Sequence, residues 1–156
     1  MPPRMRFAVP ENDVGHDTHY DYELVSRHGE LVFVAGQIPK VAADRILRPG
    51  VCGAEHDLGS ARESAALAAR QALHWIETAC EPGETVARIL RLTVYVAQTD
   101  TFTEMSEVAD AASRVFIDRL GAGGRHVRSV VGVRRLPRNA PVLVEATACV
   151  KVVTPD

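Results

Sequence analysis

The chain has 156 residues, a formal net charge of −2 at pH 7 and a mildly acidic isoelectric point. This length suits one domain with an ordinary core, and the near-neutral charge without a basic stripe argues against partners such as nucleic acid or an anionic membrane. No run is long enough to span a bilayer, and the N-terminus lacks the apolar centre of a signal peptide. The cysteines, Cys52, Cys80 and Cys149, form neither a zinc pattern nor a complete disulfide framework, which favours reduced thiols in a cytoplasmic protein.

Residues 1–20 are polar and contain prolines, so we expect an N-terminal arm followed by a single domain over residues 21–156. The arm carries His16 and His19, with Asp13 and Asp17 close by. A metal site is one interpretation of this cluster and a surface tail is the other. The tail is favoured, because a flexible segment offers a metal no preformed geometry.

Residues 22–35 predict a β-hairpin that turns at His28-Gly29, where glycine is free to adopt a positive φ. The strand should break after Ala35, because Pro39 has no N–H for a ladder and Gly36 allows a close approach of backbone or ligand. Residues 40–58 predict a loop with one short strand at most.

Residues 60–80 predict the clearest helix. Ser60 and Glu63 form a capping-box pattern, and small or aliphatic residues recur at three- and four-residue spacing. Residues 88–97 then predict a strand with Leu90, Leu92, Val94 and Val96 on one face and Arg91, Thr93 and Tyr95 on the other. A helical first turn capped by Thr85 is an alternative for its beginning.

A second helix is expected to open with a capping box at Thr101 and Glu104 and to end at the glycines of residues 121–124. Its expected buried face comprises Met105, Val108, Ala112, Val115 and Phe116. The glycines follow a helix and precede a strand, which is the reverse of the order that a phosphate-binding loop requires.

Residues 127–134 and 142–152 are rich in valine and predict two strands, which we take as a hairpin with its turn at residues 136–141. Arg128 and Glu145 interrupt these apolar runs. A charge in an apolar strand is costly unless it is paired or faces a wet cleft, although period-2 alternation also permits a solvent-facing position. The register of such a hairpin keeps the two charges apart, so they would meet most easily across a subunit boundary or along one face.

The predicted order ββ-α-β-α-ββ indicates an α+β fold with two layers, a mixed sheet with both helices packed on one face. The other face of the sheet would keep its valine, leucine and phenylalanine side chains uncovered. We therefore expect a closed, symmetric oligomer.

The sequence resembles the Rid family, whose members are also known as YjgF-type proteins or L-PSP endoribonucleases. The resemblance covers about residues 20–152. It rests on the motifs VAGQIP (residues 34–39), RLTVYV (91–96), RSVVGVRRLP (128–137) and VEA (144–146), with an alanine-rich helix after the first. The glycine, arginine and histidine at residues 124–126 are more like the longer branches of the family.

The resemblance implies a chorismate-mutase-like fold and a homotrimer with ligand clefts between subunits. It also implies hydrolysis of reactive enamines or imines to ketoacids and ammonia, without metal or organic cofactor. By position, Arg128 matches the arginine that binds the substrate carboxylate, Glu145 the glutamate near the attacking water, and Tyr22 a tyrosine of the cleft. The positions of Ala35, Gly36 and Val130 belong to the same substrate-binding set.

Three positions depart from the well-known deaminases. Ala35 replaces a serine, Val130 replaces a frequent cysteine while keeping its backbone N–H, and Ala109 or Asp110 is nearest to an expected asparagine. These changes favour a specialised substrate that carries a carboxylate.

Two other functions stay open. The first is a non-catalytic trimer that binds a small carboxylate as a sensor or regulator, which the loss of the serine and cysteine makes credible. The second is the endoribonuclease of the older family name, which is disfavoured because the chain has neither a basic stripe nor an aromatic platform for bases.

Overall fold

The computed structural model describes residues 14–15 and 20–154. The cluster of His16, His19, Asp13 and Asp17 therefore lies outside the described residues. Within the described part of the chain, no helix is long and apolar enough to cross a membrane.

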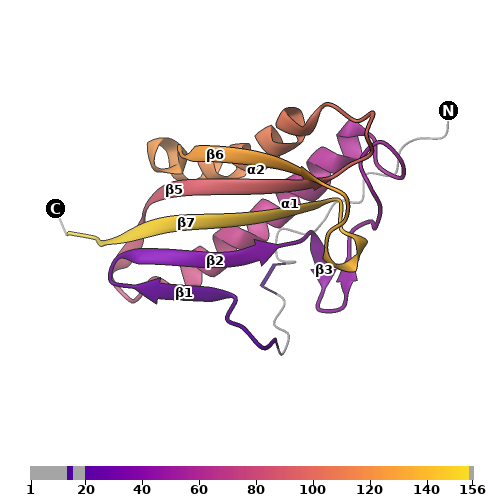
Figure 1. Cartoon of the computed structure of the whole chain (residues 1–156). Coiled ribbons are helices and arrows are strands. Elements are labelled where there is room, and N and C mark those ends of the chain that lie inside the picture. Colours follow the sequence, from indigo (N-terminus) through magenta and orange to yellow (C-terminus); the bar gives the residue numbers. More distant parts are fainter. Residues whose placement is uncertain (1–13, 16–19, 155–156) are drawn as a thin grey trace.

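A five-stranded mixed sheet forms one layer of the molecule (Figure 1). In spatial order its strands are β1 (Val25–His28), β2 (Leu31–Gln37), β7 (Val142–Val152), β5 (Glu84–Ala97) and β6 (Val127–Val133). All neighbouring strands are antiparallel except β5 and β6, which run parallel. The parallel pair is possible because a helix connects these two strands and returns the chain to the same end of the sheet.

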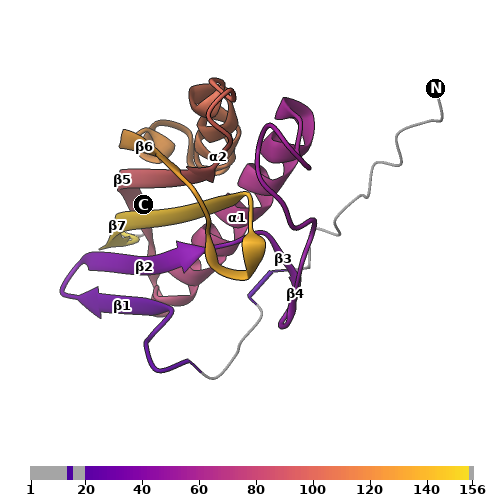
Figure 2. The ribbon, with the colours of Figure 1, turned by 45° about the vertical axis from the view of Figure 1, so that its right-hand side comes forward.

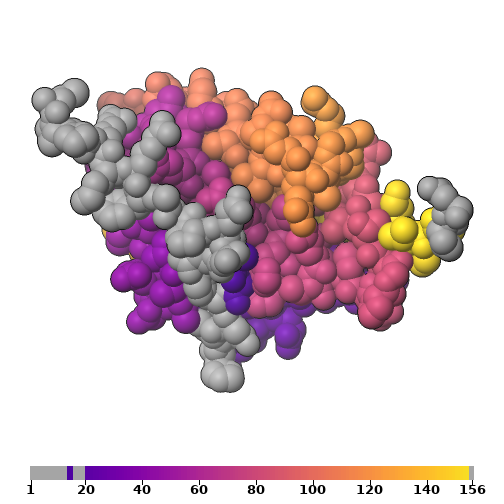
Figure 3. Space-filling view, turned by 180° about the vertical axis from the view of Figure 1, so that it is seen from behind, coloured from indigo at the N-terminus to yellow at the C-terminus, as the bar shows by residue number. Residues whose placement is uncertain are grey.

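Two helices form the second layer. Helix α1 (Leu58–Thr78) and helix α2 (Met105–Leu120) lie against the same face of the sheet, as Figure 2 shows from the side. Seen from behind in Figure 3, the colours of these helices occupy much of that surface. Alanines let α1 approach the sheet closely, and the fully buried ones are Ala61, Ala65, Ala68, Ala69 and Ala72.

Short elements close one end of the sheet. Strands β3 (Lys40–Ala42) and β4 (Arg45–Ile46) form a small hairpin, and the 3-10 helix η2 (Pro137–Asn139) packs beside it before β7 begins. At the other end, the 3-10 helix η1 (Gly121–Gly124) continues from α2. The small hairpin and η2 bring two segments that are far apart in sequence to one edge of the open face.

The predicted α+β class, the two layers and the order of the main elements are confirmed, but the pairing of the last two strands is wrong. Strands β6 and β7 do not form a hairpin, because β5 lies between them. The valine-rich pattern identifies both strands correctly but does not identify their partners. Residues 40–58 also contain two short strands rather than one at most.

Several predicted element ends also shift. The side chain of Asp57, not Ser60, caps α1 by accepting from the Ser60 N–H at 2.8 Å. Strand β5 begins at Glu84 with no helical first turn, and a register shift between Ile89 and Arg91 moves Leu90 off the buried face. Helix α2 has no side-chain hydrogen bond at its N-cap, so its predicted capping box is wrong.

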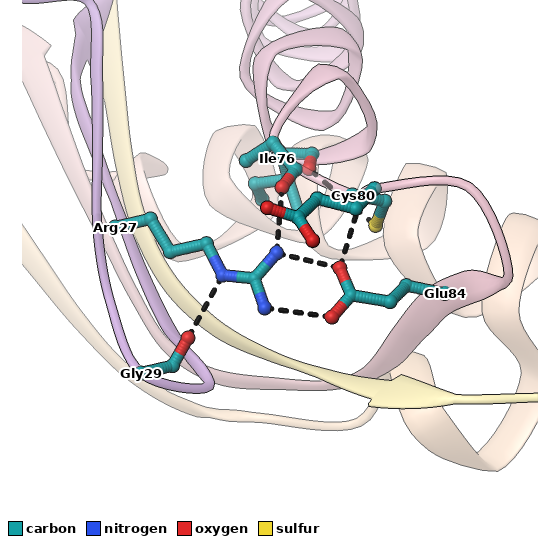
Figure 4. Close-up of polar contacts among 7 residues, drawn as sticks. Arg27, Gly29, Ile76, Cys80 and Glu84 are labelled. Carbon is teal, nitrogen blue, oxygen red and sulfur yellow. Dashed lines mark hydrogen bonds and ion pairs between the residues drawn. The ribbon is translucent and has the colours of Figure 1, made fainter.

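One ion pair ties the β1–β2 hairpin to the other layer (Figure 4). The Arg27 guanidinium donates to both carboxylate oxygens of Glu84, at 2.6 and 2.8 Å, and also to the carbonyl of Ala79 just after α1. The Arg27 guanidinium and the Glu81 N–H hold the pKa of Glu84 down at about 2. This contact joins β1, the end of α1 and the start of β5.

Candidate functional site

Glu145 lies on the open face of the sheet, away from the helices. Along β7 the side chains alternate, so that Val144 and Ala146 are buried beneath the helices while Glu145 is half-buried on the other side. Its Cα partner on β5 is Thr93. The alternation of the sequence thus places this carboxylate correctly on the polar side of its strand.

A cavity of about 430 Å³ opens beside Glu145. Its walls come from the segment before β1, the end of β2, the start of β3, the last part of β5, and the connection from β6 to β7 with the start of β7. Four of the six predicted site residues line this cavity, namely Tyr22, Ala35, Gly36 and Glu145. The structure therefore gathers residues from three separated segments that the sequence singled out.

Tyr95 holds the Glu145 carboxylate. The Tyr95 hydroxyl donates to Oε1 of Glu145 at 3.1 Å, and the negative charge of Glu145 raises the pKa of Tyr95. Tyr95 therefore stays protonated and remains a donor at neutral pH. Sequence reasoning missed this residue as part of a site, although it placed Tyr95 on the polar face of its strand.

Three further residues of the cavity were also missed. Lys40 begins β3 immediately after Pro39, and its ammonium contacts the hydroxyl of Tyr20. The guanidinium of Arg138 donates to the carbonyl of Ala43 at 3.0 Å. The position of Lys40 beside the GQIP motif was the available signal, whereas nothing local marks Tyr20 or Arg138.

Gly36 is required by packing. Strand β2 carries a bulge between Val34 and Gln37, and a Cβ on Gly36 would collide with the side chain of Leu143. The close approach expected at this glycine is therefore made by a neighbouring side chain of β7. The bulge also turns the end of β2 into the wall of the cavity.

Arg128 lies on the opposite face of the sheet. Its Cα partner on β5 is Leu92, which is fully buried beneath the helices, and Val130 packs against the same core. The Arg128 guanidinium donates from Nη1 to Oδ1 of Asp110 at 2.8 Å and to Oγ of Ser113 at 3.0 Å. Both partners belong to α2, so neither Arg128 nor Val130 lines the cavity of Glu145.

A short hydrogen-bonded chain continues from Arg128. The Nδ1 of His126 lies 2.7 Å from the carbonyl oxygen of Gly124, which can only accept, so Nδ1 carries the proton. In the neutral ring Nε2 then accepts from the hydroxyl of Ser113 at 2.9 Å. Ser113 is thus fixed with its oxygen toward Arg128. Neither Ser113 nor His126 was predicted from the sequence as a site residue.

The structure corrects the expected relation between Arg128 and Glu145. Since β5 separates their strands, no hairpin register relates them, and they lie on opposite faces of one sheet. Within one chain they cannot share a cleft along the same face. Only a second subunit could bring an Arg128 to the cavity of Glu145.

No group of three or more His, Cys, Asp or Glu side chains is arranged to hold a metal ion within residues 14–15 and 20–154. A larger cavity, of about 780 Å³, lies at the ends of β5 and β6 and is lined by Arg134 and Arg135 among others. It is separate from the cavity of Glu145, with which it shares no lining residue.

Comparisons with known proteins agree on one family. The family model described as Endoribonuclease L-PSP matches residues 16–150. Protein TCP17 of Trypanosoma cruzi is 34% identical over 119 residues, which are 76% of this chain and 74% of that protein. Atu1372 of Agrobacterium tumefaciens, solved as a protein of unknown function, has a TM-score of 0.79 at 30% identity and 86% coverage of both chains.

The YjgF gene product of E. coli shares the fold. Its TM-score is 0.56 at 23% identity, and the match covers 88% of this chain and 93% of that one. This likeness concerns the arrangement of sheet and helices, which is the chorismate-mutase-like fold.

Proposed function

The chain belongs to the endoribonuclease L-PSP family of Rid or YjgF-type proteins, and from this membership and the cavity at Glu145 we propose that it is a hydrolytic deaminase. Its substrate is a reactive imine or enamine that carries a carboxylate, and its products are a carbonyl compound and ammonia. The single observation that carries the proposal is the Glu145–Tyr95 pair in the wall of a cavity that also contains cationic side chains.

The reaction needs a water, a base for that water and a proton for the leaving nitrogen. Glu145 accepts a proton from water as the oxygen bonds to the imine carbon, and the π electrons of the C=N bond move to nitrogen. The carboxyl group then returns this proton to nitrogen, which gives a carbinolamine. The carboxylate next takes the proton of the carbinol hydroxyl and passes it to the amino nitrogen, so that ammonia leaves as the C–N bond breaks and the carbonyl forms. Tyr95 holds Oε1 of Glu145, which directs Oε2 toward the water.

Arg128 enters this site from a neighbouring subunit in our proposal. A planar guanidinium binds a carboxylate with two parallel hydrogen bonds, so it is suited to orient the substrate. The open face of the sheet exposes apolar side chains, including Phe33 at 46% and Val127 at 58% of their surface. Strand β6, which carries Arg128, is an edge strand of the sheet, so a homotrimer formed through the open face and this edge would bring Arg128 of one subunit to the cavity of the next.

A trimer that only binds a small carboxylate is the second candidate. The observation in its favour is that Ala35 and Val130 offer no side-chain polar group for a reaction at a bound ligand. Such a protein would hold an anion without turning over an imine. Turnover therefore separates the two candidates.

The test generates 2-iminopropionate from alanine with an amino-acid oxidase and measures the release of pyruvate and ammonia. The protein should accelerate this release, and Glu145→Gln should lower its rate constant by about 10²- to 10⁴-fold, the usual contribution of a positioned acid–base group. Glu30→Gln, an exposed position in the β1–β2 turn, is the matched control and should keep the full rate. No acceleration together with saturable pyruvate binding would favour the binding protein, and full activity in Glu145→Gln would remove Glu145 from the mechanism.

A further inference from the structure

Lys40 is held in the wall of the Glu145 cavity by its own backbone. Its N–H donates to the carbonyl of Ile38 at 2.8 Å, and its carbonyl accepts from Nε2 of Gln71 in α1 at 2.9 Å. Only 8% of the residue's surface is exposed. The main chain is therefore fixed on the core, and the position of the ammonium in the cavity is a property of the fold.

The ammonium of Lys40 has a neutral environment. It contacts the hydroxyl of Tyr20 and lies 4.9 Å from the centre of that ring. Within the described residues it has no carboxylate partner. A cation so largely removed from water is costly unless an opposite charge compensates it, so this ammonium is poised for an anion from outside the chain.

A second cation reaches the same cavity from a different segment. Arg138 lies in η2, where Arg138 and Asn139 both have a φ of 55°, and one of its nitrogens contacts the carbonyl of Ala43 just beyond β3. A guanidinium has five N–H donors, so several remain for a ligand. Because η2 and the β3–β4 hairpin pack together, as Figure 2 shows, Lys40 and Arg138 belong to one end of the cavity wall.

The charges of the cavity do not balance. Among the described residues that line it, Lys40 and Arg138 supply two positive charges, whereas Glu145 is the only carboxylate. One further negative charge would neutralise these three side chains. A carboxylate supplies one negative charge, whereas a phosphate carries nearly two. Carboxylate is therefore the acidic group that fits best.

Most of the remaining wall is aliphatic and aromatic. Tyr20 and Tyr22 stack with their ring centres 4.9 Å apart and their planes 11° from parallel, and Tyr95 is the third tyrosine of the cavity. These three are all the tyrosines of the chain. Their rings provide apolar surface for the carbon skeleton of a ligand between the cations and Glu145.

We propose that Lys40 and Arg138 form a carboxylate subsite inside the Glu145 cavity, so that the ligand is a small diacid. One acid group binds at Lys40 and Arg138, and the carbon skeleton packs against the tyrosines. The placement of the reacting carbon at Glu145, with the other acid group at Arg128 of a neighbouring subunit, rests on the proposed function. The Lys40 subsite itself does not, because it is defined by groups of one chain.

The experiment compares glutarate with pentanoate, which carries a methyl group where glutarate carries its second carboxylate. Isothermal titration of the full chain should show that glutarate binds at least tenfold more tightly than pentanoate, and more tightly than inorganic phosphate. Lys40→Met should reduce the affinity for glutarate to that for pentanoate while leaving pentanoate binding unchanged. Arg138→Gln, in an exposed loop that does not form the core, should weaken glutarate binding in the same direction.

Lys151 is the matched control, because it is exposed and is the only other lysine of the chain. Lys151→Met should bind glutarate as the wild type does, and glutarate should protect Lys40 but not Lys151 from acylation, as read by peptide mass spectrometry. Equal affinities for glutarate and pentanoate, tighter binding of phosphate, or a glutarate preference that survives both Lys40→Met and Arg138→Gln would overturn the proposal. Failure of imine turnover with an intact diacid preference would overturn only the deaminase function, and turnover without that preference would overturn only the subsite.

Discussion

The guanidinium of Arg128 contacts a carboxylate of its own chain, and this decides how strongly it can bind another. Asp110 is 59% exposed, so its bond to Arg128 is close to a surface ion pair, and such pairs contribute roughly 0.2–1 kcal/mol. An incoming carboxylate must displace Asp110 or share the guanidinium with it.

Asp110→Asn should therefore strengthen the binding of a monocarboxylate such as pyruvate. Removing the competing charge is expected to lower Kd by about two- to fivefold, the range that corresponds to a surface ion pair. Isothermal titration with pyruvate measures this change in Kd. Asp118→Asn removes a comparable exposed partner, that of Arg114 on the same helix, and should leave Kd unchanged.

Removing the Ser113 hydroxyl is expected to weaken the binding of pyruvate. Its hydroxyl is aligned by His126 and accepts from Arg128, so Ser113→Ala should free the guanidinium to adopt other rotamers and raise Kd for pyruvate. An unchanged Kd in both Asp110→Asn and Ser113→Ala would show that Arg128 does not bind the carboxylate.

At the level of elements, the sequence was sufficient to identify the main strands and helices but not to predict which strands pair. Period-2 and helical spacing marked every main strand and helix, because these patterns depend on neighbours in sequence. The pairing of β6 is a long-range property, and the short connection at residues 136–141 suggested a hairpin. The competing signal was the run β5–α2–β6, in which a helix between two strands favours a parallel pair.

The same limit explains which site residues were predicted. Tyr22, Gly36 and Glu145 could be selected through local motifs and a family pattern. Lys40 follows the GQIP motif, but Arg138 has ordinary surroundings in the sequence, and the two come together only because η2 packs on the β3–β4 hairpin. Ser113 and His126 likewise meet only when α2 packs beside β6.

The Arg27–Glu84 contact between elements should give the protein a specific weakness in acid. The pKa of Glu84 lies at about 2 in the folded chain, below its ordinary 4.5, so the pair stabilises fully above pH 4.5 and its contribution is lost as the pH falls toward 2. Glu84→Gln should lower Tm by about 2–4 °C at pH 7, a size typical of one lost interaction in a domain of this length.

The pH dependence identifies the cause. The difference in Tm between wild type and Glu84→Gln should shrink steadily between pH 4.5 and pH 2, as scanning calorimetry can follow. Glu77→Gln breaks an exposed contact with Arg119 and serves as the control, with little effect at any pH. A difference that stays constant down to pH 2 would mean that Glu84 acts through packing and not through its charge.

For the whole molecule, the two faces of the sheet differ in how well they are covered, and an oligomer would cover the exposed one. The helices cover one face completely enough that Val32, Leu92 and Val144 have no exposed surface. The other face keeps Leu31, Phe33 and Val131 at 39–46% exposure. Exposed apolar side chains on an uncovered sheet face favour an interaction surface, and a second and third copy of the chain would bury them symmetrically.

Phe33→Asp should therefore separate the subunits. Light scattering during gel filtration should give the wild type three times the 17.0 kDa of one chain and give the variant a smaller mass, because a carboxylate cannot be buried unpaired between apolar surfaces. Ala122→Asp also adds a carboxylate at an exposed apolar position, but in η1 and away from the open face, and should stay trimeric.

If Arg128 acts across the subunit boundary, the Phe33→Asp monomer should keep its circular dichroism spectrum yet lose imine turnover. A wild-type monomer that turns over imines would show instead that the Glu145 cavity works alone, with Lys40 and Arg138 as the cations among its described residues.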